Sequence, residues 1–181
     1  MTIKTLQVDV AIIGAGTAGM SAYRAALNHT SSVLVIEDGP YGTTCARVGC
    51  MPSKLLIAAA EAAHGARHGA AFGVHAGPVR IDGAAVMQRV RSERDRFVGF
   101  VVDAVESWPA EHRLRGRARF INANTLAVDE HTQVSARRIV IATGSSPRVS
   151  PQWRAALGDR LIVNDDVFDW AELPRSVAVL G

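Results

Sequence analysis

The stretch that decides the fold is Val8-Asp-Val-Ala-Ile-Ile-Gly14-Ala-Gly16-Thr-Ala-Gly19. It opens with a short apolar run that ends in glycine, which is typical of a buried strand, and helix-forming residues follow from Ala18 to Leu27. A second apolar run, Val33–Ile36, ends at Glu37. A strand, a helix and a strand within about thirty residues form a βαβ unit with parallel strands and a right-handed crossover. The sequence therefore predicts an α/β fold built on a parallel sheet.

The rest of the chain predicts helices around a small antiparallel segment. Helices are expected over 51–63 and 83–107, with Asp82 as the N-cap of the second, and a Gly- and His-rich loop over 65–77. Between Leu114 and Ala142 the apolar period changes to two, which predicts short strands over 115–121, 125–128, 133–135 and 138–142. The chain is expected to be irregular after Pro147 and to end in an apolar strand over 177–180.

The glycines at 14, 16 and 19 follow the pattern G-x-G-x-x-G between a predicted strand and a predicted helix. Gly14 permits a tight turn, Gly16 lets a pyrophosphate approach the backbone, and Gly19 lets the helix lie close to the strand. The helix N-terminus, at Thr17 and Ala18, then offers free N–H groups to phosphates. Glu37 can bind ribose hydroxyls and would repel a 2′-phosphate, which favours FAD or NAD over NADP. The alternative is a glycine-rich turn without a ligand.

Two cysteines, Cys45 and Cys50, lie five positions apart. In regular helix this spacing separates them by about 7.5 Å along the axis, so a disulfide requires a distorted turn, for which Gly49 supplies the freedom. Pro52 is harmless only in a first helical turn, so the helix is expected to begin at Cys50 or Met51, where a thiolate is stabilised. A redox-active disulfide is the favoured interpretation. Inert thiols and zinc ligands are the alternatives, although His64 and His68 lie in the Gly-rich segment and nothing ties them to the cysteines.

Lys54 lies one turn beyond Cys50, and it is one of only two lysines in a chain whose other cations are arginines. A compact positive charge at this position could stabilise an anion on a bound cofactor. The alternative is a solvated helix lysine.

The composition excludes several other classes of protein. The chain of 181 residues is 48% apolar and 20% charged, which is typical of a folded globular protein. Its net charge of +3 is too small to indicate nucleic-acid binding. The arginines at 113, 115, 117 and 119 are expected to share one solvated face of a strand. Neither a membrane span nor a signal peptide is expected, and no metal site, so the predicted compartment is the cytoplasm.

The run Cys45-x4-Cys50-x-Pro52-Ser53-Lys54, together with the glycine loop and Glu37, resembles the flavin-dependent pyridine nucleotide-disulfide oxidoreductases. Ala142-Thr143-Gly144-Ser145 looks like the second FAD signature of this family. The resemblance implies a Rossmann-like FAD-binding domain over 1–146. It further implies a connector and the first strand of a truncated NAD-binding domain over 147–181. Within the family, the pattern is most similar to dihydrolipoamide dehydrogenase, and a mercuric- or glutathione-type reductase is the runner-up.

The resemblance also implies a role for each matching residue. Cys45 is expected to attack the substrate disulfide, Cys50 to lie over the flavin and form a charge-transfer complex with it, and Lys54 to lie near flavin N5. The expected cofactor-binding residues are Gly14, Gly16, Thr17, Ala18, Gly19, Glu37, Asp38, Gly42, Thr43, Thr44, Cys45, Lys54, Ala118, Thr143, Gly144 and Ser145. Electrons would pass from a dithiol to the cysteine pair, then to FAD and then to NAD.

The sequence departs from the family pattern in two respects. Gly42-Thr43 stands where the family has Gly-Gly, and Arg47 stands where it usually has Asn. The later segments that carry most of the NAD site, the dimerisation domain and a His–Glu base do not appear by residue 181. We therefore expect a piece of a longer, homodimeric enzyme that is inactive alone. Its expected partners are a small dithiol or disulfide and the lipoyl domain of a multienzyme complex. A nucleotide-binding fragment with a thiol switch is the non-enzymatic alternative.

Overall fold

The computed structural model describes residues 3–180 and divides the chain into two compact units. Met1–Thr44 and Val98–Ser146 form the first, which we call the sheet unit. Cys45–Phe97 and Pro147–Gly181 form the second, which we call the helical unit.

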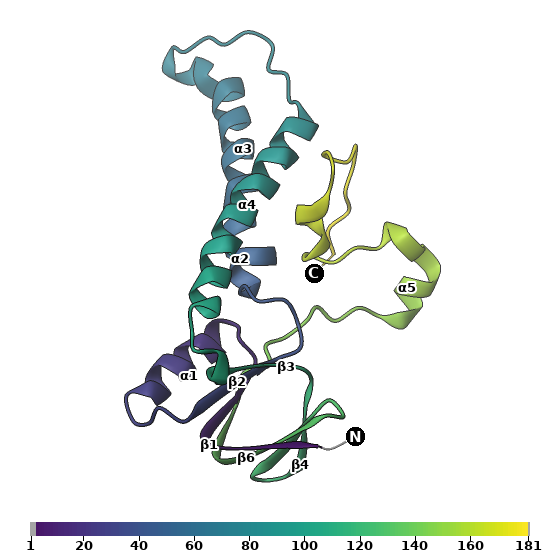
Figure 1. Ribbon diagram of the computed structural model, residues 1–181. Coiled ribbons are helices and arrows are strands. Elements are labelled where there is room, and N and C mark those ends of the chain that lie inside the picture. The colour runs from purple at the N-terminus through teal and green to yellow at the C-terminus, as the bar shows by residue number, and fades with distance from the viewer. Residues whose placement is uncertain (1–2, 181) are drawn as a thin grey trace. The chain divides into compact units, whose positions relative to one another are not determined.

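The sheet unit contains a six-stranded sheet with the order β3-β2-β1-β6-β5-β4 (Figure 1). Strands β1 (Lys4–Ile13), β2 (Val33–Glu37), β3 (Arg113–Arg115) and β6 (Thr132–Ile141) are parallel to their neighbours among these four. Strands β4 (Ala118–Asn122) and β5 (Thr125–Val128) add an antiparallel segment beside β6. This arrangement confirms the predicted α/β fold, with a parallel sheet and a small antiparallel part.

Both faces of the parallel sheet are buried, which explains why its strands read as continuous apolar runs. Neighbouring residues of β1 belong to different clusters: Ala11 packs with Leu34 and Ile36, and Ile12 packs with Val33 and with Tyr23 of α1 (Thr17–Leu27). Helix α1 packs against β1 and β2 and so covers the second face. The βαβ unit therefore has the helix-over-sheet packing that its sequence predicts.

The second half of the sheet differs from prediction in two places. The expected strands 133–135 and 138–142 are one strand, because β6 pairs with β1 from Lys4↔Thr132 to Ile13↔Ile141. The expected strand 115–121 is broken by Gly116, whose φ of +143° ends β3. Since β3 and β4 lie at opposite edges of the sheet, the prediction that the four arginines share one strand face is wrong.

The helical unit consists mainly of helices. They are α2 (Thr44–Val48), α3 (Cys50–His68), η1 (Gly69–Phe72), most of α4 (Gly83–Glu106), α5 (Pro151–Leu157), η3 (Gly158–Arg160) and η4 (Asp166–Asp169). Helix α2 begins at the boundary between the units. The short helix η2 (Ala110–His112) belongs to the sheet unit. Asp82 is the predicted N-cap of α4, since its Oδ1 accepts a hydrogen bond from the Ala85 N–H at 3.0 Å. The expected loop from residue 65 is wrong at its start, because α3 continues through Gly65 to His68.

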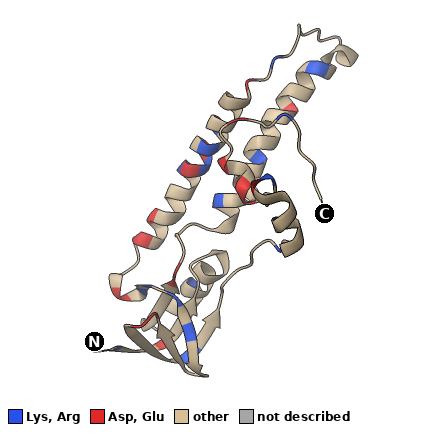
Figure 2. Cartoon of the chain, turned by 90° about the vertical axis from the view of Figure 1, so that its right-hand side faces the viewer, with Lys and Arg blue, Asp and Glu red and all other residues tan. Residues whose placement is uncertain are grey.

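Within the helical unit, two arginines of α4 bind the segment that contains η4. Arg94 forms ion pairs with Asp169 at 2.6 Å and Asp95 at 2.8 Å, and the Arg91 guanidinium donates to the Trp170 carbonyl oxygen. Phe168 of this segment is buried. Basic and acidic residues are interleaved along α4, as Figure 2 shows. The arginines of this helix are therefore balanced by carboxylates.

The region after Pro147 differs from prediction. It contains the short helices α5, η3 and η4 where the sequence predicts irregular chain. The expected strand over 177–180 does not form, and Val179 is 87% exposed. A strand needs a neighbour to supply its hydrogen bonds, and the described residues place none beside this run. The final glycine of the predicted motif, Gly181, lies outside the described residues. Among residues 3–180, none of the helices combines the length and apolarity needed to cross a membrane.

Candidate functional site

The glycine loop connects β1 to α1 at the carboxyl end of the parallel strands. Gly14 has φ of +105°, and a Cβ there would overlap the Ala142 carbonyl oxygen. A Cβ on Gly19 would overlap the carbonyl oxygen of Gly14. A Cβ on Gly16, in contrast, would meet nothing within 4 Å. Gly14 and Gly19 are thus required by packing within the protein, whereas Gly16 leaves its backbone open to a ligand, as the motif predicts.

The N-terminus of α1 provides the positive end of a helix dipole. Gly16 is its N-cap, no side chain caps the helix, and its first residues, Thr17 and Ala18, are exposed. The N–H groups of a first helical turn have no acceptor within the helix. They therefore suit a phosphate group, and this part of the site fits the pyrophosphate of a dinucleotide.

Glu37, the last residue of β2, holds the loops on either side of it. Its Oε2 accepts a hydrogen bond from the Ala15 N–H at 2.7 Å, and its Oε1 accepts one from the Gly39 N–H at 2.8 Å. The residue is half-buried. A carboxylate has about four acceptor positions, so Glu37 can brace both loops and still accept hydrogen bonds from ribose hydroxyls.

Two further predicted segments adjoin this end of the sheet. The Ala142 N–H donates to the Ile13 carbonyl oxygen at 2.8 Å, which places Ala142 and Thr143 next to Gly14, and Gly144 and Ser145 follow them in the chain. The Gly116 N–H donates to the Glu37 carbonyl oxygen at 3.1 Å, and Ala118 begins β4 two residues later. The glycine loop, Glu37 and Thr143 thus lie where parallel α/β sheets bind their ligands, whereas Ala118 is related through Val128 and Thr132 to Lys4 at the start of β1.

The loop over residues 38–44 is held by an aromatic contact that sequence reasoning missed. The Arg115 guanidinium lies 4.7 Å from the centroid of the Tyr41 ring, and Tyr41 packs against the cluster around Ile12. Arg115 is in register with Glu37, so the contact lies beside the predicted ribose site. The sequence feature that could have indicated this contact is Tyr41, the aromatic residue directly before Gly42. Gly42 itself is buried and has φ of +99°. Asp38 and Thr44 are exposed, and Thr43 is half-buried.

The two cysteines lie on either side of a break between helices. Cys45 is in α2, and Cys50 is the first residue of α3, as predicted. Gly49 between them has φ −132° and ψ −116°, which interrupts the helix and supplies the expected distortion. Both are free thiols; Cys45 is half-buried and Cys50 is exposed. Pro52 is buried in the first turn of α3, where its missing N–H costs nothing.

The two thiols interact directly. The hydrogen bond with the Cys50 side chain, and secondarily burial, raises the pKa of the Cys45 thiol above its ordinary value. Cys45 therefore holds its proton more tightly than an isolated cysteine does. Cys50 is the exposed first residue of α3. The two thiols therefore differ, since Cys45 is half-buried with a raised pKa and Cys50 is open to solvent.

Lys54 is exposed on α3, one turn after Cys50. The intervening Ser53 donates its hydroxyl proton to the Cys50 carbonyl oxygen at 3.0 Å. The predicted catalytic residues are therefore together at the start of α3 in the helical unit. The predicted nucleotide-binding residues, apart from Cys45 and Lys54, are together in the sheet unit, and the Thr44–Cys45 peptide bond joins the two groups.

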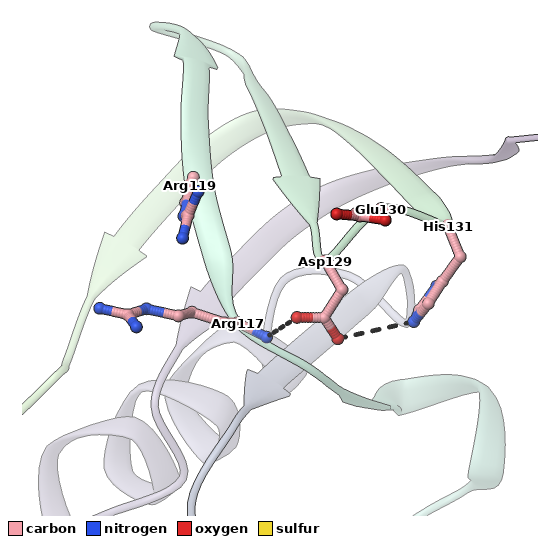
Figure 3. Close-up of a pocket in the computed structure, with 5 residues that line it drawn as sticks. All are labelled: Arg117, Arg119, Asp129, Glu130 and His131. Atoms are coloured by element: carbon pink, nitrogen blue, oxygen red, sulfur yellow. Dashed lines mark hydrogen bonds and ion pairs between the residues drawn. The ribbon is translucent and has the colours of Figure 1, made fainter.

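A pocket of about 440 Å³ lies elsewhere in the sheet unit. It is lined by Arg117, Arg119, Asp129, Glu130 and His131 (Figure 3). Asp129 accepts a hydrogen bond from the Arg117 N–H at 3.0 Å and lies 3.5 Å from Nε2 of His131. The carboxylate thus holds the β5–β6 turn, where Asp129 itself has φ of +48°. None of the predicted site residues lines this hollow.

The described residues contain no group of three or more His, Cys, Asp or Glu side chains arranged to hold a metal ion. The cysteines are thus not joined there by further ligands of the kind that a structural zinc site requires.

These features define a dinucleotide-binding α/β protein that carries a pair of interacting thiols. The family model described as pyridine nucleotide-disulphide oxidoreductase matches residues 8–181, and the chain belongs to this family. The family is FAD-dependent and uses NAD or NADP.

Curated relatives with three different names match nearly the whole chain. A glutathione reductase from Burkholderia cepacia is 34% identical over 96% of this chain and 37% of the relative. A dihydrolipoyl dehydrogenase from Geobacillus stearothermophilus is 30% identical over 97% and 37%. A mercuric reductase from Streptomyces lividans is 35% identical over 96% and 37%. The chain thus spans little more than a third of the length of these relatives.

The fold also matches a solved structure. A Cu(II) complex of the HOCl-induced flavoprotein disulfide reductase RclA from Escherichia coli superposes with a TM-score of 0.71. The match covers 92% of this chain and 34% of that one, at 23% identity, and it concerns the fold alone.

Proposed function

We propose that the protein is an FAD-dependent oxidoreductase that passes electrons between a dithiol, dihydrolipoamide, and NAD through a Cys45–Cys50 disulfide. The observation that carries this proposal is the pair of free thiols on either side of the helix break at Gly49, one in α2 and one at the first residue of α3. The break removes the separation that a regular helix would impose on a disulfide, and the family to which the chain belongs supplies the cofactor.

The sheet unit fits the FAD that the family implies. Open backbone at Gly16 and the uncapped N-terminus of α1 suit the pyrophosphate, and Glu37 suits the ribose. Thr143 to Ser145 and the backbone near Ala118 complete the proposed site. When bound, FAD supplies a two-electron carrier between the thiols and the nicotinamide. Glu37 favours FAD over a nucleotide with a 2′-phosphate at this site, because its carboxylate would repel that group.

The cysteines have distinct roles in the proposed exchange with the substrate. In the oxidised protein, a substrate thiolate attacks Sγ of Cys45, and the Cys45–Cys50 bond breaks with Cys50 leaving as a thiolate. The second substrate thiol then attacks the mixed disulfide at the substrate sulfur, which releases Cys45 and the substrate disulfide. Two electrons have moved from the substrate to the cysteine pair, and the protons pass to Cys45 and to solvent.

The geometry supports this assignment of roles. Cys50, the proposed leaving group, is the exposed first residue of α3 and is therefore accessible when the disulfide breaks. The raised pKa of Cys45 favours its protonation when it is released. We place Lys54 beside the cofactor, where its charge would stabilise an anionic group.

The names of the relatives support glutathione and mercuric reductases as alternatives to dihydrolipoyl dehydrogenase. Ser53-Lys54 favours the lipoamide and mercuric branches. We further propose a cytoplasmic homodimer that acts on a small dithiol or on a lipoyl domain, with NAD bound mostly outside this chain. The second candidate is a nucleotide-binding fragment whose cysteines act as a thiol switch, which the exposure of Cys50 favours.

Steady-state assays of the purified full-length protein test the proposal. Dihydrolipoamide with NAD⁺ is compared with glutathione disulfide and with Hg²⁺, each reduced by NADH or NADPH. The expected result is the highest kcat/KM with dihydrolipoamide and NAD⁺, and loss of this activity in Cys45→Ser and Cys50→Ser. Activity with glutathione disulfide or Hg²⁺ alone would overturn the substrate. A flavin-free protein whose cysteines oxidise reversibly would instead support the thiol switch.

A further inference from the structure

The C-terminal end of α3 presents two exposed histidines on one side of the helix. His64 and His68 are four residues apart, and their rings stack with centroids 4.0 Å apart at an interplanar angle of 24°. The sequence assigns this pair no role, because the helix is predicted only over 51–63, the segment that follows is Gly-rich and nothing ties the histidines to the cysteines. The structure shows α3 continuing to His68, so the pair has true helical i, i+4 spacing.

A hydrogen bond fixes the tautomer of His68. Its Nδ1 lies 2.8 Å from the carbonyl oxygen of His64. A carbonyl oxygen only accepts, so Nδ1 carries the proton, and in the neutral ring Nε2 keeps a free lone pair. Metal-binding histidines have this arrangement, in which one ring nitrogen donates to a carbonyl and the other binds the ion.

The position on the helix favours a cation. His68 is the last residue of α3, where the carbonyl groups of the final turn form the negative end of the helix dipole. Glu61 lies on the same face, three residues before His64, and adds a carboxylate one turn away. The positive charge of Arg67 opposes cation binding. Arg67 lies about 100° around the helix axis from His68, so it is not on the face that carries the two histidines.

The separation of the rings suits chelation. An ion that binds two imidazole nitrogens at about 2.0–2.1 Å holds them about 3 Å apart. The ring centroids are 4.0 Å apart, so the two side chains are within reach of one ion, and binding requires the stacked rings to rotate until their in-plane lone pairs converge. Two histidines spaced i, i+4 on one helix face are also the arrangement that zinc-binding helices use.

We propose that His64 and His68 form a surface binding site for a late first-row divalent cation such as Cu²⁺, Ni²⁺ or Zn²⁺. The two imidazoles supply two ligands and water supplies the others, since no group of three or more metal-binding side chains is arranged around an ion among residues 3–180, and Glu61 adds only a nearby negative charge. The order of affinity for such nitrogen ligands places Cu²⁺ above Ni²⁺ and Zn²⁺. This inference does not depend on the proposed redox function.

The site is separate from the cysteines. His64 lies fourteen positions after Cys50 in α3, which corresponds to about 21 Å along the helix axis. An ion held by the histidines therefore does not touch the thiols of the same chain. Binding at the two places can be distinguished by experiment.

The test is a titration of the full-length protein in a Cys45→Ser/Cys50→Ser background, which removes the competing thiols. Isothermal titration calorimetry with Ni²⁺ is expected to show one binding site. The affinity of this site for Ni²⁺ should fall at least about tenfold in His64→Ala and in His68→Ala. His29→Ala, which changes an exposed histidine in the sheet unit, is the matched control and should leave the affinity unchanged. Alanine is a strong helix former, so α3 should persist, and circular dichroism checks this.

Two spectroscopic readouts complete the test. Electron paramagnetic resonance of bound Cu²⁺ should show coupling to nitrogen that is reduced in either histidine variant. Hydrogen exchange should show slower exchange of the last turn of α3 when Ni²⁺ is present. An affinity that is unchanged in both single variants, or reduced equally in His29→Ala, would overturn the proposed site.

Discussion

The sheet unit and the helical unit use their residues in opposite ways. In the sheet unit, the glycine loop depends on positions where a side chain cannot fit, and backbone groups face the proposed ligand. In the helical unit, the reactive groups are exposed or half-buried side chains at the two ends of α3, with thiols at its positive end and imidazoles at its negative end. Changes at the glycine loop of the first unit should therefore affect folding and cofactor retention, and changes at the reactive side chains of the second should affect chemistry alone.

The largest expected effect follows from removing a thiol. Cys45→Ser and Cys50→Ser should each lower kcat for disulfide exchange at least about a thousandfold, because no other nucleophile replaces the sulfur. The melting temperature and the flavin content of the full-length protein should change little, since Cys50 is exposed and Cys45 only half-buried. A large loss of bound flavin in both variants would contradict the expectation that the sheet unit retains the cofactor and that the cysteines contribute only to the chemistry.

The next largest effect is expected at Gly19. A side chain there would overlap the Gly14 carbonyl oxygen, so Gly19→Val should lower the free energy of unfolding by about 3 kcal/mol and release flavin. The matched control is Gly65→Ala in α3, where a Cβ meets nothing within 4 Å and the helix should gain stability. Denaturant unfolding measures the change in the free energy of unfolding for both variants. Equal changes at the two glycines would contradict the expected difference between the two units.

A smaller effect is expected from the contact between Arg115 and Tyr41. Arg115→Met should weaken flavin binding about two- to fivefold, which corresponds to the worth of an exposed cation–π contact. Tyr41→Phe keeps the ring and should bind flavin as the parent does, whereas Tyr41→Leu should match Arg115→Met. Fluorescence titration of the apoprotein with FAD gives these affinities, and a loss in Tyr41→Phe as large as in Tyr41→Leu would rule out the ring as the cause.

The smallest expected effect is on the titration of Cys45. Because the hydrogen bond with Cys50 raises the pKa of Cys45, Cys50→Ala should lower it. The thiolate is the reactive form, so alkylation of Cys45 by iodoacetamide should reach half its maximal rate at a lower pH in Cys50→Ala than in the reduced parent. Mass spectrometry of the labelled peptide follows the rate, and a profile that stays in place or moves to higher pH would show that the hydrogen bond does not control Cys45.

The comparison between the units also explains what the sequence could predict. The βαβ unit, the start of α3 at Cys50 and the Asp82 cap follow from local patterns, namely apolar runs, a proline in a first turn and a capping side chain. The single strand β6 was missed because its pairing with β1 spans more than a hundred residues and continues through polar positions. Gly65 was taken to end α3, but one glycine costs a helix only about 1 kcal/mol.

The site divides in the same way. The glycines and the cysteine spacing are visible in the sequence because each requires a particular residue type. The placement of Gly116 against the Glu37 carbonyl oxygen and of Arg115 over Tyr41 depends on pairing between distant segments. The same is true of the stacked histidines, which became visible only when α3 proved to reach His68.

The central claim is that Cys45 and Cys50 form one reversible disulfide coupled to bound flavin. The most direct measurement is a count of titratable thiols, with the visible spectrum, in the full-length protein before and after two-electron reduction. We predict a yellow protein that gains two thiols and a long-wavelength absorption band on reduction, with neither gain in the double serine variant. The same number of thiols before and after reduction, with no new band, would contradict the claim.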